Sequence, residues 1–138
     1  KYAVCEEIAQ TSIDLGVDPA LAISIAIEES GLEEGLVSKV GAQGPLQIIP
    51  RYFCPDRKGV VAPRKSRGIL QGCDLTYYGV KAIDWFLKEY EGEGKDMGIR
   101  GALCHYNSGT HCNSSSRAYA QRILLRYRSW KAQIKARK

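Results

Sequence analysis

Two adjacent carboxylates, Glu28 and Glu29, end an apolar stretch, ALAISIAI, that predicts a buried helix. A carboxyl group in the last turn of such a helix loses hydration and lies near the negative end of the helix dipole. Both effects favour the protonated form, and a carboxyl group that is protonated near neutral pH is suited to general acid catalysis. The alternative is that both residues belong to an ordinary solvated helix end.

A glycine-containing stretch, SKVGAQGPLQIIP, follows at residues 38–50. Gly41 and Gly44 allow a turn and a close approach of the backbone to a ligand. Gln47 lies between Leu46 and Ile48, so its amide is expected on the face opposite those two side chains, where it can bind a sugar hydroxyl or acetamido group. A plain tight turn with a surface glutamine is the alternative.

A third polar motif, HYNSG, runs from His105 to Gly109. Its aromatic hydroxyl, followed by Asn, Ser and Gly at a predicted helix end, is suited to hydrogen bonding with a polar ligand. A capped helix end with a core tyrosine is the alternative here.

In this order and spacing, the three motifs resemble the soluble, goose-lysozyme-like lytic transglycosylases. That family has Glu-Ser-Gly at a helix end, then Ser-x-x-Gly-Ala-x-Gly-Leu-Met-Gln-Ile-x-Pro, then Tyr-Asn-Ala-Gly and a later Tyr. This chain departs from it at Pro45-Leu46, which replace Leu-Met, and the likeness spans about residues 20–125. The matching residues are Glu29-Ser30-Gly31, Ser38 to Pro50, Tyr106-Asn107-Ser108-Gly109, Tyr119, and Cys73-Asp74-Leu75 with Gly79.

The resemblance implies an enzyme that cuts the β-1,4 bond between N-acetylmuramic acid and N-acetylglucosamine in peptidoglycan glycan strands. Glu29 would protonate the leaving oxygen and then act as base on the muramic C6 hydroxyl, with help from the substrate's acetamido group. The product is a 1,6-anhydro sugar, no water is consumed, and no cofactor or metal is expected. The substrate-binding residues implied by the resemblance are Ser38, Gly44, Gln47, Ile48, Tyr106, Asn107 and Tyr119.

A single catalytic carboxylate fits this reaction, because a second one is needed when it must act as nucleophile or activate water. No Asp or Glu occurs from Val37 to Pro55, although Glu33, Glu34 and Asp56 lie close enough in sequence to be partners. Two alternatives therefore stay open: a muramidase that uses water, and a non-catalytic peptidoglycan-binding module.

The elements that position the first motif are predicted to be two helices, at residues 2–15 and 19–30. Asp18 and Pro19 are typical N-cap and first-turn residues for the second helix, and Gly31 is suited to end it. Residues 35–50 predict a small irregular β-hairpin, because glycines interrupt short β-prone pieces.

A basic loop is expected at residues 51–72, and three helices should follow it. They lie at about 75–90 with Asp74 as cap, from Asp96 as cap to about Tyr106, and from about Ser116 to the end of the chain. The predicted fold is α+β, mainly α: one lysozyme-like domain over residues 1–138.

The chain has five cysteines, and proximity in sequence favours the pairs Cys54–Cys73 and Cys104–Cys112, with Cys5 unpaired. A Cys5–Cys73 bridge and five reduced thiols are the alternatives. Disulfides indicate an oxidising compartment, which together with the resemblance predicts a periplasmic or other extracytoplasmic location, in a bacterial or phage-encoded setting.

The set Cys104-His105 and His111-Cys112 also offers four zinc ligands, but its spacing is not that of a usual zinc finger. A short disulfide loop is the favoured interpretation. A cysteine peptidase is disfavoured, because no spaced Asn or Asp partner supports a triad.

Composition adds little to this assignment. The chain has 44% hydrophobic and 25% charged residues, typical of a globular domain, and no segment approaches the ~18 apolar residues of a membrane span. Its net charge of +5 predicts attraction to polyanions in general. The basic residues of the last predicted helix are spread around it, which favours a solvated face over nucleic-acid or membrane binding. Participation in a larger cell-envelope machine is compatible with all of this.

Overall fold

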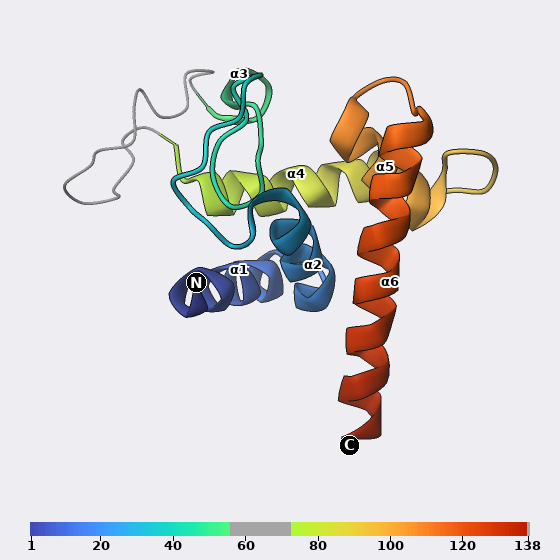
Figure 1. The fold of residues 1–138 in the computed structure, drawn as a ribbon, viewed down its shortest axis with the longest axis horizontal. Helices are drawn as coiled ribbons and strands as arrows, with labels where there is room; N and C mark the ends of the chain where they lie inside the picture. The colour runs from blue at the N-terminus through green and yellow to red at the C-terminus, as the bar shows by residue number, and fades with distance from the viewer. Residues whose placement is uncertain (56–72, 138) are drawn as a thin grey trace. The chain divides into compact units, whose positions relative to one another are not determined.

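In the computed structural model, which describes residues 1–55 and 73–137, the chain is mainly helical (Figure 1). It divides into two compact units, Lys1–Ala82 and Ile83–Lys138. The helices are α1 (Tyr2–Leu15), α2 (Pro19–Ser30), α3 (Pro50–Phe53), α4 (Leu75–Glu89), α5 (Gly98–Ser108) and α6 (Ser114–Ala136).

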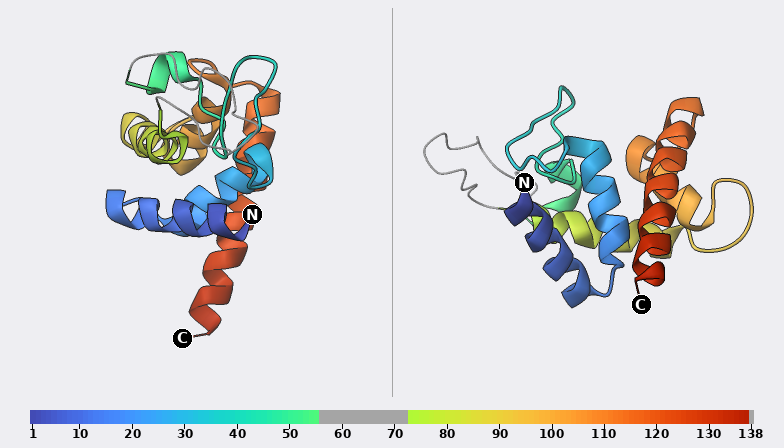
Figure 2. Two further views of the ribbon diagram at one scale, coloured as in Figure 1. Left: turned by 90° about the vertical axis from the view of Figure 1, so that its left-hand side faces the viewer. Right: turned by 60° about the horizontal axis from the view of Figure 1, so that its bottom comes forward.

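In the first unit, α1 and α2 pack against each other (Figures 1 and 2). The side chain of Asp18 accepts a hydrogen bond from the backbone N–H of Ala20 at 3.0 Å, and Pro19 begins α2, as predicted. Gly31 ends the helix in the left-handed conformation with φ 65°. Every residue from Ala20 to Ala26 is buried, because small and apolar residues occur on all sides of this helix.

The predicted β-hairpin at residues 35–50 is wrong. The described residues there form two isolated bridges, Val37 with Gln43 and Gln43 with Ile48, and no strand. The physical reason is backbone conformation: Gly41, Gly44 and Gln47 have φ values of 88°, 82° and 52°. Each of these left-handed residues turns the chain out of the extended path that a strand ladder requires.

The expected basic loop begins differently from the prediction, because Pro50–Phe53 form the short helix α3. Residues 56–72, which carry most of the basic side chains of that loop, lie outside the described residues. The Cys54–Cys73 disulfide that was predicted to join the ends of the loop is confirmed. Both of its cysteines are buried.

Helix α4 begins in the first unit and ends in the second. Asp74 caps it as predicted, since its carboxylate accepts a hydrogen bond from the N–H of Tyr77 at 3.0 Å. In the first unit, the fully buried side chains of large volume are Ile8, Ile25, Leu46 and Val80.

In the second unit, α5 packs along the N-terminal half of α6 (Figure 1). The predicted cap Asp96 is wrong: Met97 precedes α5 and makes no side-chain cap bond. Asp96 has φ 60°, and its carbonyl lies so close to α5 that a Cβ at Gly101 would overlap it. The Asp96 carboxylate is directed to α6 instead, where it binds Arg117.

Helix α6 begins at Ser114, two residues before the predicted start. Asn113 and Ser116 form a capping box, in which each side chain binds the backbone N–H of the other at 2.8 Å. The apolar stripe of α6 is buried at Tyr119 and Ile123, whereas Ile134 is 47% exposed. Among the described residues, no helix combines the length and apolar character that a membrane crossing requires.

Candidate active site

Glu29 lies in the last turn of α2 and is half-buried, as is Glu28. The next residue, Ser30, connects this helix end to the glycine-containing segment. Its hydroxyl donates to the carbonyl of Pro45 at 2.7 Å and also lies 3.2 Å from the carbonyl of Ala26. The end of α2 that carries Glu29 is therefore held against the turn that contains Gly44 to Gln47.

The Gly44–Gln47 turn is braced by the side chain of Gln47. Its amide nitrogen Nε2 lies 2.8 Å from the carbonyl of Gly44 and 2.9 Å from the carbonyl of Leu36. Because carbonyls only accept, both amide hydrogens are used inside the protein, and Gln47 can offer a ligand only its amide oxygen. The backbone supports the same turn through a bond from the N–H of Gln47 to the carbonyl of Gly44 at 3.1 Å.

Ser38 and Ile48 also brace this segment. The Ser38 hydroxyl accepts from the N–H of Ala42 at 3.0 Å, and the N–H of Ser38 donates to the Ala42 carbonyl at 2.9 Å. Ile48 is 2% exposed, and its backbone pairs with that of Gln43 in both directions, at 2.8 and 3.2 Å. Ser38 thus braces the segment through its hydroxyl and its backbone, and Ile48 does so through its backbone.

The N-terminal half of α4 supports the turn through two glycine contacts. A Cβ at Gly44 would lie 2.8 Å from the Cβ of Leu75, and a Cβ at Gly79 would lie 2.6 Å from the Cδ1 of Leu46. These distances are shorter than van der Waals contact, so glycine is required for the turn to lie this close to α4.

The other predicted site residues lie in the second unit. Tyr106 is half-buried in the last turn of α5. Its ring and that of Phe86 pack edge to face, with their centroids 5.5 Å apart. Asn107 is exposed, and Tyr119 in α6 is only 4% exposed. The structure describes these residues within their own unit, separately from Glu29.

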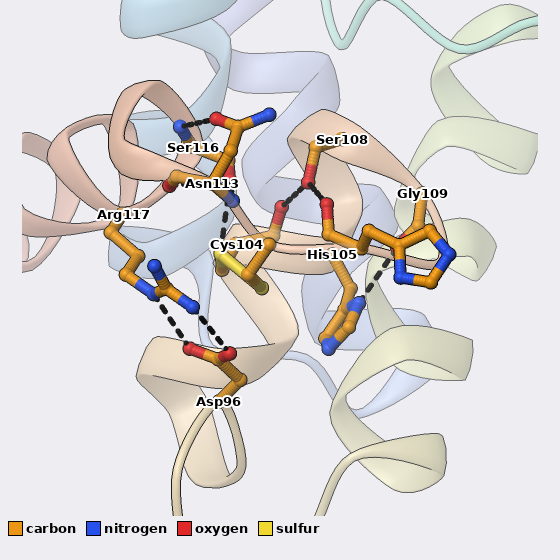
Figure 3. A network of polar contacts seen from close by, with 10 residues as sticks. Asp96, Cys104, His105, Ser108, Gly109, Asn113, Ser116 and Arg117 are labelled. Carbon is orange, nitrogen blue, oxygen red and sulfur yellow. Dashed lines mark hydrogen bonds and ion pairs between the residues drawn. A yellow bond between two sulfur atoms is a disulfide. The ribbon is translucent and has the colours of Figure 1, made fainter.

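A dense set of bonds holds the turn after Tyr106 (Figure 3). The hydroxyl of Ser108 lies 3.1 Å from the carbonyl of Cys104 and 2.6 Å from the carbonyl of His111. The predicted Cys104–Cys112 disulfide is confirmed and closes the same loop. The turn is thus tied to the buried end of α5 by both covalent and hydrogen bonds.

Asp96 and Arg117 form an ion pair near this loop (Figure 3). Nε and Nη2 of Arg117 donate to the two carboxylate oxygens of Asp96 at 3.0 and 2.9 Å. These hydrogen bonds, more than the charge of the guanidinium, hold the pKa of Asp96 below its ordinary value and raise the pKa of Arg117.

The family model of the transglycosylase SLT domain matches residues 7–124. The chain belongs to this family. The match covers both carboxylates, the glycine-containing segment and the Tyr106–Gly109 motif. Comparison with curated proteins gave no match to this chain. SLT domains act on peptidoglycan outside the cytoplasm, and the two disulfides of this SLT domain fit that location.

The zinc site considered for this SLT domain would need the sulfurs of Cys104 and Cys112, which are joined to each other. His105 points its Nδ1 at the carbonyl of Gly109, 2.7 Å away. Asp96 is the third potential ligand near the two sulfurs, and it binds Arg117. Cys5, predicted to stay unpaired, is the free cysteine among the described residues.

Two structural roles were not predicted from the sequence. The sequence assigns no role to Ser30, whose hydroxyl links α2 to the carbonyl of Pro45. The Glu-Ser-Gly motif contained the signal, because it places a hydroxyl directly after Glu29. Arg117 belongs to the helix whose basic residues are expected to form a solvated face, and the structure pairs it with Asp96.

Proposed function

We propose that this SLT domain is a lytic transglycosylase that cleaves the β-1,4 bond between N-acetylmuramic acid and N-acetylglucosamine and forms a 1,6-anhydromuramic end. Glu29 is the catalytic residue. Ser38, Gly44, Gln47, Ile48, Tyr106, Asn107 and Tyr119 contact the glycan. The site acts in the periplasm or another extracytoplasmic compartment, without a cofactor.

One observation carries this proposal: the 2.7 Å bond from Ser30 to the carbonyl of Pro45. It holds the end of α2, which carries the half-buried Glu29, against the turn that contains Gly44, within the segment matched by the SLT family. A carboxyl group held in a fixed position is what general acid catalysis on a glycan requires.

In the proposed reaction, the carboxyl proton of Glu29 moves to the glycosidic oxygen as the bond from that oxygen to the muramic C1 breaks. The carbonyl oxygen of the substrate's acetamido group stabilises the positive charge that develops at C1. The Glu29 carboxylate then removes the proton of the muramic C6 hydroxyl, and O6 bonds to C1. The second step restores the acid, and the net reaction consumes no water.

Mass spectrometry of digested peptidoglycan tests the reaction. Anhydromuramic ends are expected. Reducing muramic ends would replace the proposal by a muramidase, and binding to the wall without released fragments would replace it by a non-catalytic module.

The variant Glu29→Gln tests the residue, because it keeps the size of the side chain and removes its proton transfer. Fragment release should fall by about 10²–10⁴-fold, the usual contribution of a general acid, while folding and wall binding are retained. Glu28→Gln is the matched control and should retain most activity. Full activity of Glu29→Gln would refute the assignment.

A further inference from the structure

His105, directly before Tyr106, binds the following turn through both its backbone and its side chain (Figure 3). The backbone N–H of Gly109 donates to the carbonyl of His105 at 2.7 Å, and the ring Nδ1 of His105 lies 2.7 Å from the carbonyl of Gly109. A carbonyl only accepts, so Nδ1 carries the hydrogen and donates. His105 is 8% exposed, so this geometry is held away from water.

The ring of His105 also begins a chain of aromatic contacts, formed by His105, Tyr90, Phe86 and Tyr106. His105 stacks on Tyr90, with centroids 3.8 Å apart and planes at 6°. Tyr90 stacks on Phe86 at 6.1 Å and 13°, and Phe86 meets Tyr106 at 5.5 Å and 67°. All four residues belong to the second unit, and the aromatic chain leads from His105 back to the ring of Tyr106.

These contacts give His105 two connections to the motif that follows it. The Nδ1 bond fixes Gly109, whose φ of 80° and ψ of −130° lie in a region that is open to glycine alone. The aromatic chain restricts the direction of the Tyr106 ring through its contact with Phe86. In the sequence, Tyr106 and Asn107 lie between His105 and Gly109.

We propose that His105 is a positioning residue of the transglycosylase site, which sets the orientation of Tyr106 and Asn107 without touching the glycan itself. This inference rests on the proposed function, in which those two residues contact the substrate. A histidine that served only the packing of the core would change stability alone. A positioning residue also changes turnover in protein that is fully folded, because small displacements of substrate-contacting groups are costly to catalysis.

The test replaces His105 with two amide side chains of different length, Asn and Gln. In His105→Asn, the amide nitrogen occupies the place of Nδ1 and can still donate to Gly109, whereas in His105→Gln it lies one carbon further out and cannot occupy that place. His105→Phe keeps the stack on Tyr90 and removes the donor. The kcat and KM of fragment release from purified peptidoglycan are measured at a temperature where circular dichroism shows each variant to be folded.

We expect kcat to fall by about 10–100-fold in His105→Gln and His105→Phe with little change in KM. His105→Asn should recover about tenfold of that loss. In ¹H–¹⁵N spectra, the Gly109 and Asn107 amides should stay near their wild-type positions in the Asn variant and shift in the Gln variant. If the Phe variant does not fold, the comparison of Asn with Gln decides.

Equal, wild-type turnover in folded His105→Asn and His105→Gln would overturn the positioning role while leaving the proposed function intact. A wild-type protein that releases no fragments would instead overturn the proposed function, and the positioning role with it. The two failures are therefore distinguishable in one set of assays.

Discussion

The hydroxyl of Ser30 donates to the carbonyl of Pro45 at 2.7 Å, and this bond joins the last residue of α2 to a turn fifteen residues later in the chain. Helix α2 is buried from Ala20 to Ala26, so the bond ties the segment that carries Gln47 to a well-packed helix. The hydroxyl is also within reach of the N–H of Glu33, at 3.2 Å, which fixes the chain after the helix.

Replacing Ser30 with Ala should lower fragment release by about 10–100-fold and the free energy of unfolding by about 1 kcal/mol. The Pro45 carbonyl loses its partner, and the turn is free to move away from Glu29. Chemical denaturation and a peptidoglycan digest measure the two effects. Ser24→Ala is the control, because the Ser24 hydroxyl binds the carbonyl of Ala20 within its own helix. Equal loss of activity in both variants would contradict a specific role for Ser30.

Replacing Gln47 with Glu should destabilise the Gly44–Gln47 turn. The change exchanges the amide nitrogen for a carboxylate oxygen that faces the carbonyls of Leu36 and Gly44, so two hydrogen bonds become repulsive contacts. The loss should be about 2 kcal/mol, measured by urea denaturation at pH 7. Gln133→Glu, which adds the same charge at an exposed position of α6, should change stability by only a few tenths of a kcal/mol. A stable Gln47→Glu variant would show that the amide does not brace the turn.

Replacing Gly79 with Ala should destabilise the first unit by about 1–3 kcal/mol, because the new Cβ would overlap the side chain of Leu46. Alanine has a higher helix propensity than glycine by about 1 kcal/mol, so a net loss can only come from this contact. Thermal unfolding measures it, and Gly35→Ala, where a Cβ meets nothing within 4 Å, is the control. An unchanged or higher Tm in Gly79→Ala would mean that Leu46 can move aside without cost.

The sequence predicted most helix boundaries because local rules decide them. Asp18 with Pro19 and Gly31 act on their immediate neighbours, and the structure places α2 between them as expected. The disulfide pairs were also accessible, since each joins cysteines that are close in sequence. The SLT family was accessible as well, because short motifs carry it.

The features that the sequence did not predict have a common physical cause, which is contact between residues distant in the chain. The sequence around Gln47 does not show that it adopts φ 52°, because its side chain also binds the carbonyl of Leu36, eleven residues earlier. Asp96 has the composition of a helix cap, yet Arg117, distant in sequence, binds its carboxylate. The link from Ser30 to Pro45 likewise joins two segments whose patterns are independent of each other.

Replacing Glu7 with Gln should stabilise the protein slightly at neutral pH. Loss of hydration, followed by repulsion from Asp74 and Glu34, raises the pKa of Glu7 above 4.5. The folded state therefore binds the proton more tightly, and stability falls as the pH rises through that raised pKa. Glu7 is exposed, so the gain should be a few tenths of a kcal/mol near pH 7 and should vanish below about pH 4.5. Urea midpoints at both pH values measure it, and a variant less stable than wild type at pH 7 would contradict the raised pKa.

Replacing Asp96 with Asn tests the ion pair with Arg117 without changing the backbone, because asparagine also tolerates the left-handed conformation found there. The Arg117 bonds lower the pKa of Asp96 below 3.8, so the stability they contribute is present above that value and is lost as the pH falls through the lowered pKa. The Tm of Asp96→Asn should therefore lie below that of wild type at pH 7, and the gap should close in acid. Asp84→Asn is the control, because it removes an ion pair with Lys88 within one exposed helix turn, and such pairs contribute little. A gap between Asp96→Asn and wild type that stays constant from pH 7 to pH 2 would show that the effect comes from packing and not from the charge of Asp96.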